Sequence, residues 1–215
     1  MQIASRQTKI IVVSAPSGTG KSTVLTRLLN SYPDLNLSIS HTTRDPRGAE
    51  RDGVEYYFVD DATFDRMVAE SAFLEWATVH GKSYGSSLAE LRRLQAQGKD
   101  VLFDIDVQGG SQIKHQLSEA LLIFLLPPSV KILVERLTGR GTENAEEIGR
   151  RMHNALLELE AGRGYDFHVV NADLNQAVES IDAIRRGALT RPARQDKHLD
   201  RLIREARIYL TGQHR

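Results

Sequence analysis

The sequence of 215 residues contains no cysteine and carries no net charge. The lack of cysteine excludes a disulfide framework, a thiolate nucleophile and a cysteine metal site. Because 28 Lys and Arg balance 28 Asp and Glu, the chain lacks the basic excess that bulk binding to nucleic acid or to an anionic membrane usually needs. Hydrophobic residues make up 40% of the chain, which is enough for a packed core and excludes an acidic disordered protein.

Long apolar runs are also missing. The longest, residues 120–126, is followed at once by two prolines, whereas a membrane helix needs about 20 apolar residues. Residues 10–13 are too short a run for the apolar part of a signal peptide, which is about 7–15 residues long. We therefore expect a soluble, cytoplasmic protein with no membrane partner.

Lysine is scarce, with 7 Lys against 21 Arg. The planar guanidinium of arginine pairs bidentately with phosphate, so the bias suits a phosphate-binding protein. A GC-rich genome produces the same bias through arginine codons. The positions of the arginines therefore have to decide between the two explanations.

The hydrophobic pattern predicts an α/β protein. Residues 9–14 form a β-branched run that is apolar on both faces, as in the middle of a parallel sheet. An amphipathic helix is expected at 21–30. Further strands are expected at 101–103, 121–126 and 168–170, and further helices at 111–116, 129–137 and 145–161. Because strands alternate with helices, we expect a parallel sheet with helices on both faces.

Two segments depart from this alternation. Residues 35–97 contain a cluster of charges, a short strand expected at 55–59 and helices expected at 62–70 and 87–97, so this segment is an excursion from the sheet. At the other end, residues 185–215 carry nine Arg and Lys against three Asp and Glu, and a last helix is expected at 196–210.

The strongest motif is the loop between the first strand and the first helix. Residues 15–22 read A-P-S-G-T-G-K-S, which matches the Walker A pattern G-x-x-x-x-G-K-[ST] except for the first glycine. Its glycines let backbone N–H groups turn inward around an anion, and the following helix adds its positive N-terminus. The lysine can reach the β- and γ-phosphates, and the final hydroxyl can ligate Mg²⁺. The predicted ATP-binding residues are Ala15, Pro16, Ser17, Gly18, Thr19, Gly20, Lys21 and Ser22.

Several further motifs indicate which family of phosphate-loop proteins this is. They are S-I-S-H-T-T-R-D-P-R-G-A-E-R-D-G-V-E-Y-Y-F-V at 38–59, F-L-E-W at 73–76, Y-G-S at 84–86, D-I-D-V-Q-G at 104–109, G-R-G-T-E at 139–143 and V-N-A-D-L at 170–174. In this order, over about residues 8–190, the sequence resembles the bacterial-type guanylate kinases, which transfer the γ-phosphoryl group of ATP to GMP. Two departures from the family pattern are Gly48, one place early with Ala49 after it, and Ala172, where the family often has an acid.

The resemblance implies an organisation for the chain. It implies a P-loop NTPase core at 1–36, 98–137 and 159–190, into which a GMP-binding lobe at 37–97 and a lid at 138–158 are inserted. A basic helical tail follows at 191–215. Function in purine nucleotide metabolism is implied as well, with Mg²⁺ as cofactor and ATP and GMP as the ligands.

The resemblance also implies roles for individual residues. The GMP phosphate is expected at Arg44, Arg47, Tyr56 and Tyr84, and the guanine at Ser40, Glu75, Ser86 and Asp106. Arg136, Arg140 and Arg151 are expected to close over the transferring phosphoryl group, Asp104 to order Mg²⁺ through water, and Asn171 to lie near the adenine. The expected catalytic residues are Lys21, Arg44, Arg136, Arg140, Arg151 and Asp104, and the expected metal-binding residues are Ser22 and Asp104.

The chemistry agrees with this assignment. A carboxylate can accept from guanine N1–H and N2–H₂ together, whereas adenine presents the opposite pattern and would leave a buried acid unpaired. Sites built to hydrogen-bond one substrate can reject another by about 10⁴–10⁵-fold. No general base is required, because the acceptor phosphate is already ionised near neutral pH. Catalysis then depends on positioning and charge neutralisation.

Three alternatives remain at this point. A non-catalytic guanylate-kinase-like interaction module would typically lose phosphate-loop residues, which are present here. A P-loop kinase of a phosphorylated sugar would lose the acid and hydroxyls that read guanine. The basic tail could bind nucleic acid, but an amphipathic helix with residues 199, 202, 203, 206 and 210 packed inward explains it better. Self-association is left open.

Overall fold

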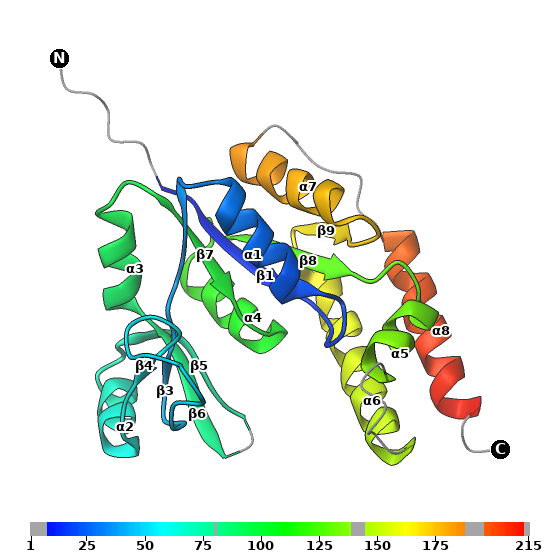
Figure 1. Cartoon of the computed structure of the whole chain (residues 1–215), viewed down its shortest axis with the longest axis horizontal. Helices are drawn as coiled ribbons and strands as arrows, with labels where there is room; N and C mark the ends of the chain where they lie inside the picture. Colours follow the sequence, from blue (N-terminus) through cyan, green and yellow to red (C-terminus); the bar gives the residue numbers. More distant parts are fainter. Residues whose placement is uncertain (1–7, 80, 139–144, 188–195, 213–215) are drawn as a thin grey trace. The chain divides into compact units, whose positions relative to one another are not determined.

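The computed structural model describes residues 8–79, 81–138, 145–187 and 196–212 (Figure 1). The chain divides into two compact units, which are described here one at a time. Unit 1 comprises Met1–Val12 and Tyr32–Ala120, and unit 2 comprises Val13–Ser31 and Leu121–Arg215.

The described residues contain a five-stranded sheet with the strand order β2-β7-β1-β8-β9. Its strands are β1 (Ile10–Ser14), β2 (Leu35–Leu37), β7 (Asp100–Asp104), β8 (Leu121–Leu126) and β9 (Phe167–Val170). β2 pairs in parallel with β7, and β8 pairs in parallel with β9. All five residues of β1 are buried, as expected for an all-apolar strand. The predicted α/β class is therefore confirmed.

Unit 1 also contains a four-stranded sheet that the sequence pattern did not predict. Its order is β4-β3-β6-β5, with β3 (His41–Thr42), β4 (Tyr57–Phe58), β5 (Phe73–Val79) and β6 (Lys82–Ser87). The hairpin of β5 and β6 is antiparallel. β5 buries its first three residues in succession and exposes most of the rest, so it shows no regular alternation for a sequence reading to detect. Against this sheet, Phe64 of α2 (Asp61–Ala69) stacks on Phe73 with ring centroids 4.6 Å apart.

The other helices of unit 1 are α3 (Leu88–Gln95) and α4 (Val107–Gln116). The predicted start of α4 at residue 111 was wrong. The helix begins four residues earlier, at Val107, because Asp106 caps it. Its Oδ1 accepts a hydrogen bond from the Gly109 backbone N–H at 2.9 Å. Two glycines in the first turn, Gly109 and Gly110, hid this start, since glycine has a low intrinsic helix propensity.

Unit 2 contains the helices α1 (Lys21–Ser31), α5 (Val130–Thr138), α6 (Ala145–Ala161), α7 (Leu174–Arg186) and α8 (Asp196–Gly212), and the short 3₁₀ helix η1 (Gly162–Gly164). The sequence analysis missed α7, although its ends carry clear signals. Asp173 caps the start by accepting from the Gln176 N–H, and Gly187 ends the helix in the left-handed conformation at φ 74°.

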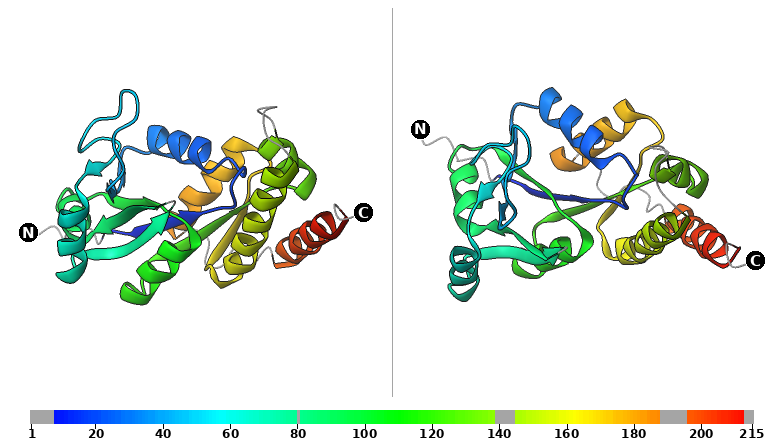
Figure 2. Two further views of the ribbon diagram at one scale, coloured as in Figure 1. Left: turned by 90° about the horizontal axis from the view of Figure 1, so that it is seen from below. Right: turned by 60° about the horizontal axis from the view of Figure 1, so that its bottom comes forward.

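The last helix, α8, lies beside α6 in both views of Figure 2. Leu199, Leu202, Ile203 and Ala206 are buried, and Leu210 is half-buried, so the prediction of an inward-facing apolar stripe is confirmed. Arg201, Arg204 and Arg207 are exposed on this packed helix. Among the described residues, no helix is both long enough and apolar enough to cross a membrane.

Candidate functional site

The phosphate loop of unit 2 has the backbone conformation that its glycines make possible. Gly18 and Gly20 have φ values of 84° and 93°, in the left-handed region that favours glycine. Packing adds a second constraint, because a Cβ on Gly20 would lie 2.9 Å from Asn171 Nδ2 and one on Gly18 would lie 3.0 Å from Leu137 Cδ2. Both glycines are therefore required by conformation and by space.

One carbonyl group holds this loop in place. The Thr19 carbonyl oxygen accepts a hydrogen bond from Arg136 Nη1 at 2.8 Å and another from Asn171 Nδ2 at 2.8 Å. Thr19 is fully buried, and Asn171, which follows β9, is 7% exposed. Two of the predicted site residues, Arg136 and Asn171, are thus tied to the loop backbone. At the start of α1, Lys21 is half-buried and Ser22 is exposed.

Helix α6 brings two more side chains to the same loop. Arg151 Nη1 donates to the Leu137 carbonyl at 3.0 Å, and its Nη2 lies 3.5 Å from Ser17 Oγ. The Ser17 backbone N–H donates to Glu158 Oε2 at 3.3 Å. Arg151 is half-buried, and these contacts place it at the loop. The predicted site residue Arg140 lies outside the described residues.

Unit 1 contains a pocket of about 540 Å³. It brings together residues that are separated by up to 66 positions in the sequence. Of the predicted residues it is lined by Ser40, Arg44, Arg47, Tyr56, Glu75, Tyr84, Asp104 and Asp106, and of residues not predicted by Ala77, Val79, Lys82 and Ile105. Ala77, Val79 and Lys82 belong to the β5–β6 hairpin and lie outside the quoted motifs, whereas Ile105 lies within D-I-D-V-Q-G and directly follows β7.

Glu75 and two serines form the acidic end of the pocket. Glu75 is 6% exposed, and its Oε1 accepts a hydrogen bond from Ser86 Oγ at 2.6 Å. Ser86 lies behind the pocket wall, fully buried, with its Oγ 3.4 Å from Ser40 Oγ. Burial raises the pKa of Glu75; the hydrogen bond from Ser86 opposes this rise, and the negative charge of Asp106 adds to it.

Gly109 touches both acids at this end. Its N–H donates the capping hydrogen bond to Asp106 Oδ1, and a Cβ at this position would lie 2.8 Å from Glu75 Oε2. A residue larger than glycine would force the Glu75 carboxylate to move. Gly109 was quoted within the D-I-D-V-Q-G motif, but the reason for a glycine there is visible only in the packing.

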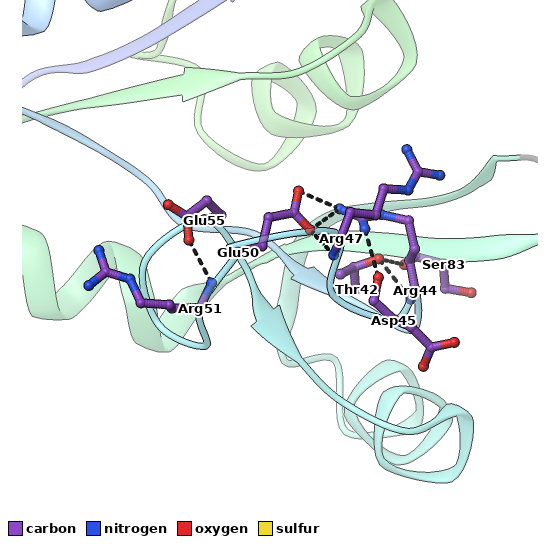
Figure 3. A network of polar contacts seen from close by, with 8 residues as sticks. All are labelled: Thr42, Arg44, Asp45, Arg47, Glu50, Arg51, Glu55 and Ser83. Atoms are coloured by element: carbon purple, nitrogen blue, oxygen red, sulfur yellow. Dashed lines mark hydrogen bonds and ion pairs between the residues drawn. The ribbon is translucent and has the colours of Figure 1, made fainter.

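The loop before β4 forms the basic end of the pocket, shown in Figure 3. Arg44 donates from Nη1 to the Asp45 carbonyl at 2.7 Å and from Nη2 to Glu50 Oε1 at 3.0 Å. Its guanidinium carbon lies 5.3 Å from the centre of the Tyr56 ring, and the rings of Tyr56 and Tyr84 are 6.0 Å apart. These contacts hold Arg44 in one orientation on an aromatic wall.

Glu50 organises this loop, and the sequence analysis did not select it. Its Oε2 accepts from the Arg47 backbone N–H at 2.8 Å, and its own N–H donates to the Arg47 carbonyl at 3.0 Å (Figure 3). The intervening Gly48 has φ 55°, so the early glycine supplies the left-handed residue of this turn. The hydrogen bond from Arg47 is the main cause of the lowered pKa of Glu50, with the Arg44 guanidinium also contributing.

The fold and the loop together define a class of protein. A buried strand, a glycine loop closed by Gly20-Lys21-Ser22 and an amphipathic helix follow one another in an α/β sheet protein. This is the structure of P-loop nucleotide-binding proteins.

Comparison with known proteins narrows the class. The family model for guanylate kinase matches residues 7–186. The chain is 48% identical to the guanylate kinase of Syntrophotalea carbinolica over 81% of its length and 83% of that protein, and 45% identical to that of Neisseria meningitidis serogroup A over 89% and 94%. The crystal structure of guanylate kinase from Anaplasma phagocytophilum matches with a TM-score of 0.67 at 30% identity, covering 85% of this chain and 87% of that one. The chain belongs to the guanylate kinase family.

Proposed function

We propose that this protein catalyses the transfer of the γ-phosphoryl group of ATP to GMP, giving ADP and GDP. The observation that carries the proposal is the buried Glu75 carboxylate, bonded to Ser86, in the same pocket as Arg44 and Arg47. A nucleobase with two N–H groups on one edge can donate two hydrogen bonds to the Glu75 carboxylate. A phosphate can bind the guanidinium groups of the two arginines. A nucleoside monophosphate with a guanine base combines both groups.

The two ends of the pocket divide the recognition of GMP. At the base end, Glu75 and Asp106 accept from the guanine and Ser40 supplies a hydroxyl group, while the buried Ser86 acts through its hydrogen bond to Glu75. At the other end the phosphate is bound by Arg44, Arg47, Tyr56 and Tyr84. The pair Glu50–Arg44 supports this division, because it orients one guanidinium before any phosphate arrives.

ATP binds on the phosphate loop of unit 2. Lys21 contacts the β- and γ-phosphates, and backbone N–H groups within residues 18–22 surround them. The bonds from Arg136 and Asn171 to the Thr19 carbonyl support this assignment, since they fix the conformation of the loop. Arg151 and, from the lid, Arg140 neutralise charge on the transferring group. The division into core, GMP-binding lobe at 37–97, lid at 138–158 and tail at 191–215 belongs to the same proposal.

Mg²⁺ suits the oxygen donors that this chain offers. The Ser22 hydroxyl and, through water, the exposed Asp104 carboxylate would hold it, and both are the hard ligands that Mg²⁺ prefers. No cluster of three metal-ligating side chains occurs among the described residues, which agrees with an ion held mainly by substrate phosphates. Bound there, Mg²⁺ neutralises the phosphate charge that develops during transfer. The site of action would be the cytoplasm.

A coupled assay that measures ADP release tests the proposal with three acceptors: GMP, AMP and ribose 1,5-bisphosphate. We expect turnover with GMP alone. Turnover of the sugar phosphate without GMP would establish the sugar kinase instead, and the absence of any turnover would support the non-catalytic module. In Lys21→Ala, we expect turnover to be abolished while calorimetry still detects GMP binding.

A further inference from the structure

Strand β5 carries Glu75 at the edge of its sheet. In the order β4-β3-β6-β5 it has β6 on one side only. The pairing with β6 is irregular at the critical point, because the register shifts between Phe73 and Glu75. Such a bulge leaves backbone groups unpaired and re-aims side chains. The register pairs Glu75 with Ser86 but skips Leu74, so pairing with β6 does not hold the residue directly before Glu75.

Helix α4 supplies the second support for this strand. Gln112 makes two hydrogen bonds to Trp76: its Oε1 accepts from the Trp76 N–H at 3.2 Å, and its Nε2 donates to the Trp76 carbonyl at 3.1 Å. One turn later, Gln116 Nε2 donates to the Leu74 carbonyl at 3.0 Å. The two glutamines bind the residues directly before and after Glu75.

The spacing of the two elements makes this arrangement work. Four residues of helix rise about 6 Å, and two residues of strand rise about 6.8 Å, so side chains at i and i+4 of α4 reach residues two apart on β5. The side-chain amides of Gln112 and Gln116 therefore take the place of a neighbouring strand along β5.

Asp106 is the N-cap residue of the same helix, and Gly109 in its first turn packs against the Glu75 carboxylate. α4 thus joins the two acids at the base end of the pocket. We propose that Gln112 and Gln116 are positioning residues that hold the Glu75 carboxylate at the correct place for guanine relative to Asp106 and Ser86. This inference rests on the proposed function, because it concerns the recognition of GMP in that reaction.

The test compares Gln112→Met, Gln116→Met and the double variant with the full-length protein. Methionine has similar length and helix propensity but cannot make the amide bonds. A matched control is Gln176→Met, which changes an exposed glutamine on α7. The substrates are GMP and inosine monophosphate, which lacks the N2 amino group that a carboxylate would bind.

We expect the KM for GMP to rise about 2- to 10-fold in each single variant, as the loss of one or two hydrogen bonds implies. The KM for inosine monophosphate should rise less, so the preference for GMP falls, while the KM for ATP stays unchanged.

Other results would overturn the inference. If both variants keep the wild-type preference for GMP over inosine monophosphate, or if the constants for ATP change as much as those for GMP, the glutamines have no such positioning role. A variant that does not fold, judged by its melting curve, shows a structural role and also counts against the proposal, unless the other single variant folds with reduced preference. Failure of the wild-type protein to phosphorylate GMP would instead refute the proposed function, so the two failures are distinguishable.

Discussion

The carboxylate of Glu50 forms an ion pair with the guanidinium of Arg44, with 2.9 Å between Oε2 and Nη2. The same oxygen accepts from the Arg47 backbone N–H. One acid therefore orients Arg44, a proposed phosphate-binding residue, and closes the turn that carries Arg47, the other. Arg44 is preorganised before substrate binds, and preorganisation lowers the entropic cost of binding.

The first prediction concerns this pair. In Glu50→Gln the charge that orients Arg44 is lost, although an amide oxygen can still accept from Arg47. We expect the KM for GMP to rise about tenfold, because the charge-assisted hydrogen bond that orients Arg44 is lost. The KM for ATP should not change.

Steady-state kinetics with each substrate varied in turn measure this effect. The matched control is Glu55→Gln, since Glu55 Oε2 accepts from the Arg51 backbone N–H at 2.7 Å in the same loop (Figure 3). An equal rise of the KM for GMP in the two variants would mean that the stability of the loop, not the orientation of Arg44, is responsible.

The second prediction concerns the pH dependence of GMP binding. Burial, reinforced by the charge of Asp106, raises the pKa of Glu75 above its usual value of 4.5. As the pH falls, this carboxyl is protonated earlier than an ordinary glutamate and stops accepting from guanine. The affinity for GMP should therefore decrease at pH values where exposed carboxylates are still ionised.

Calorimetric titration of GMP between pH 5 and pH 8 measures this decrease. Glu75→Gln should bind GMP weakly and should keep only the pH dependence of the GMP phosphate itself, whose second pKa is about 6. The same pH dependence in wild type and Glu75→Gln would contradict a raised pKa of Glu75.

The third prediction concerns the stability cost of the same acid. A raised folded pKa means that the folded protein binds the proton more tightly than the unfolded chain, so stability declines as the pH rises from 4.5 through the folded pKa. Glutamine removes this cost and can still accept from Ser86. We expect Glu75→Gln to melt at the same temperature as the wild type or higher at pH 8, despite its loss of activity.

Melting curves at pH 5 and pH 8 provide the measurement. The difference between variant and wild type should be more favourable to the variant at pH 8. A large destabilisation at both pH values would show that the carboxylate is a structural element of the pocket.

The fourth prediction concerns the phosphate loop. Removing the Asn171 side chain leaves the buried Thr19 carbonyl with the hydrogen bond from Arg136 only. In Asn171→Ala we expect the KM for ATP to rise about tenfold, from the loss of about 1–2 kcal/mol of loop stabilisation. The KM for GMP should be unchanged. Asn175→Ala, at an exposed position of α7, is the control. An unchanged KM for ATP in Asn171→Ala would show that ATP binding does not depend on this hydrogen bond.

The fifth prediction concerns the tail helix. Leu202 of α8 is 0% exposed, whereas Ile208 on the same helix is 69% exposed. Leu202→Ala should lower the free energy of unfolding by about 2–5 kcal/mol, as cavity-forming substitutions do. Ile208→Ala should change it by less than about 0.5 kcal/mol. Chemical denaturation of both variants tests the difference, and similar values would show that α8 is not packed as part of the fold.

Local sequence determined the phosphate loop and the strands that flank it. Residues 15–22 form their loop through neighbours in the chain, since glycines with positive φ, a helix N-terminus and a buried strand all lie within 25 positions. The buried strands Ile10–Ser14 and Leu121–Leu126 were likewise readable as runs of apolar residues. The family motifs supplied most of the residues that line the pocket of unit 1, but not the contacts between them.

The β5–β6 hairpin, the start of α4 and the function of Glu50 depended on tertiary structure. β5 lacks alternation because α2 and α4 both pack against its first half, while most of its second half is exposed. Gly109, which weakens the start of α4, leaves the space that the Glu75 carboxylate occupies. The sequence by itself therefore determined which groups are available to bind phosphate and base. Only the tertiary structure decided where they meet, because the bonds Ser86–Glu75, Gln112–Trp76 and Asn171–Thr19 join positions 11, 36 and 152 residues apart, and no local pattern encodes such distances.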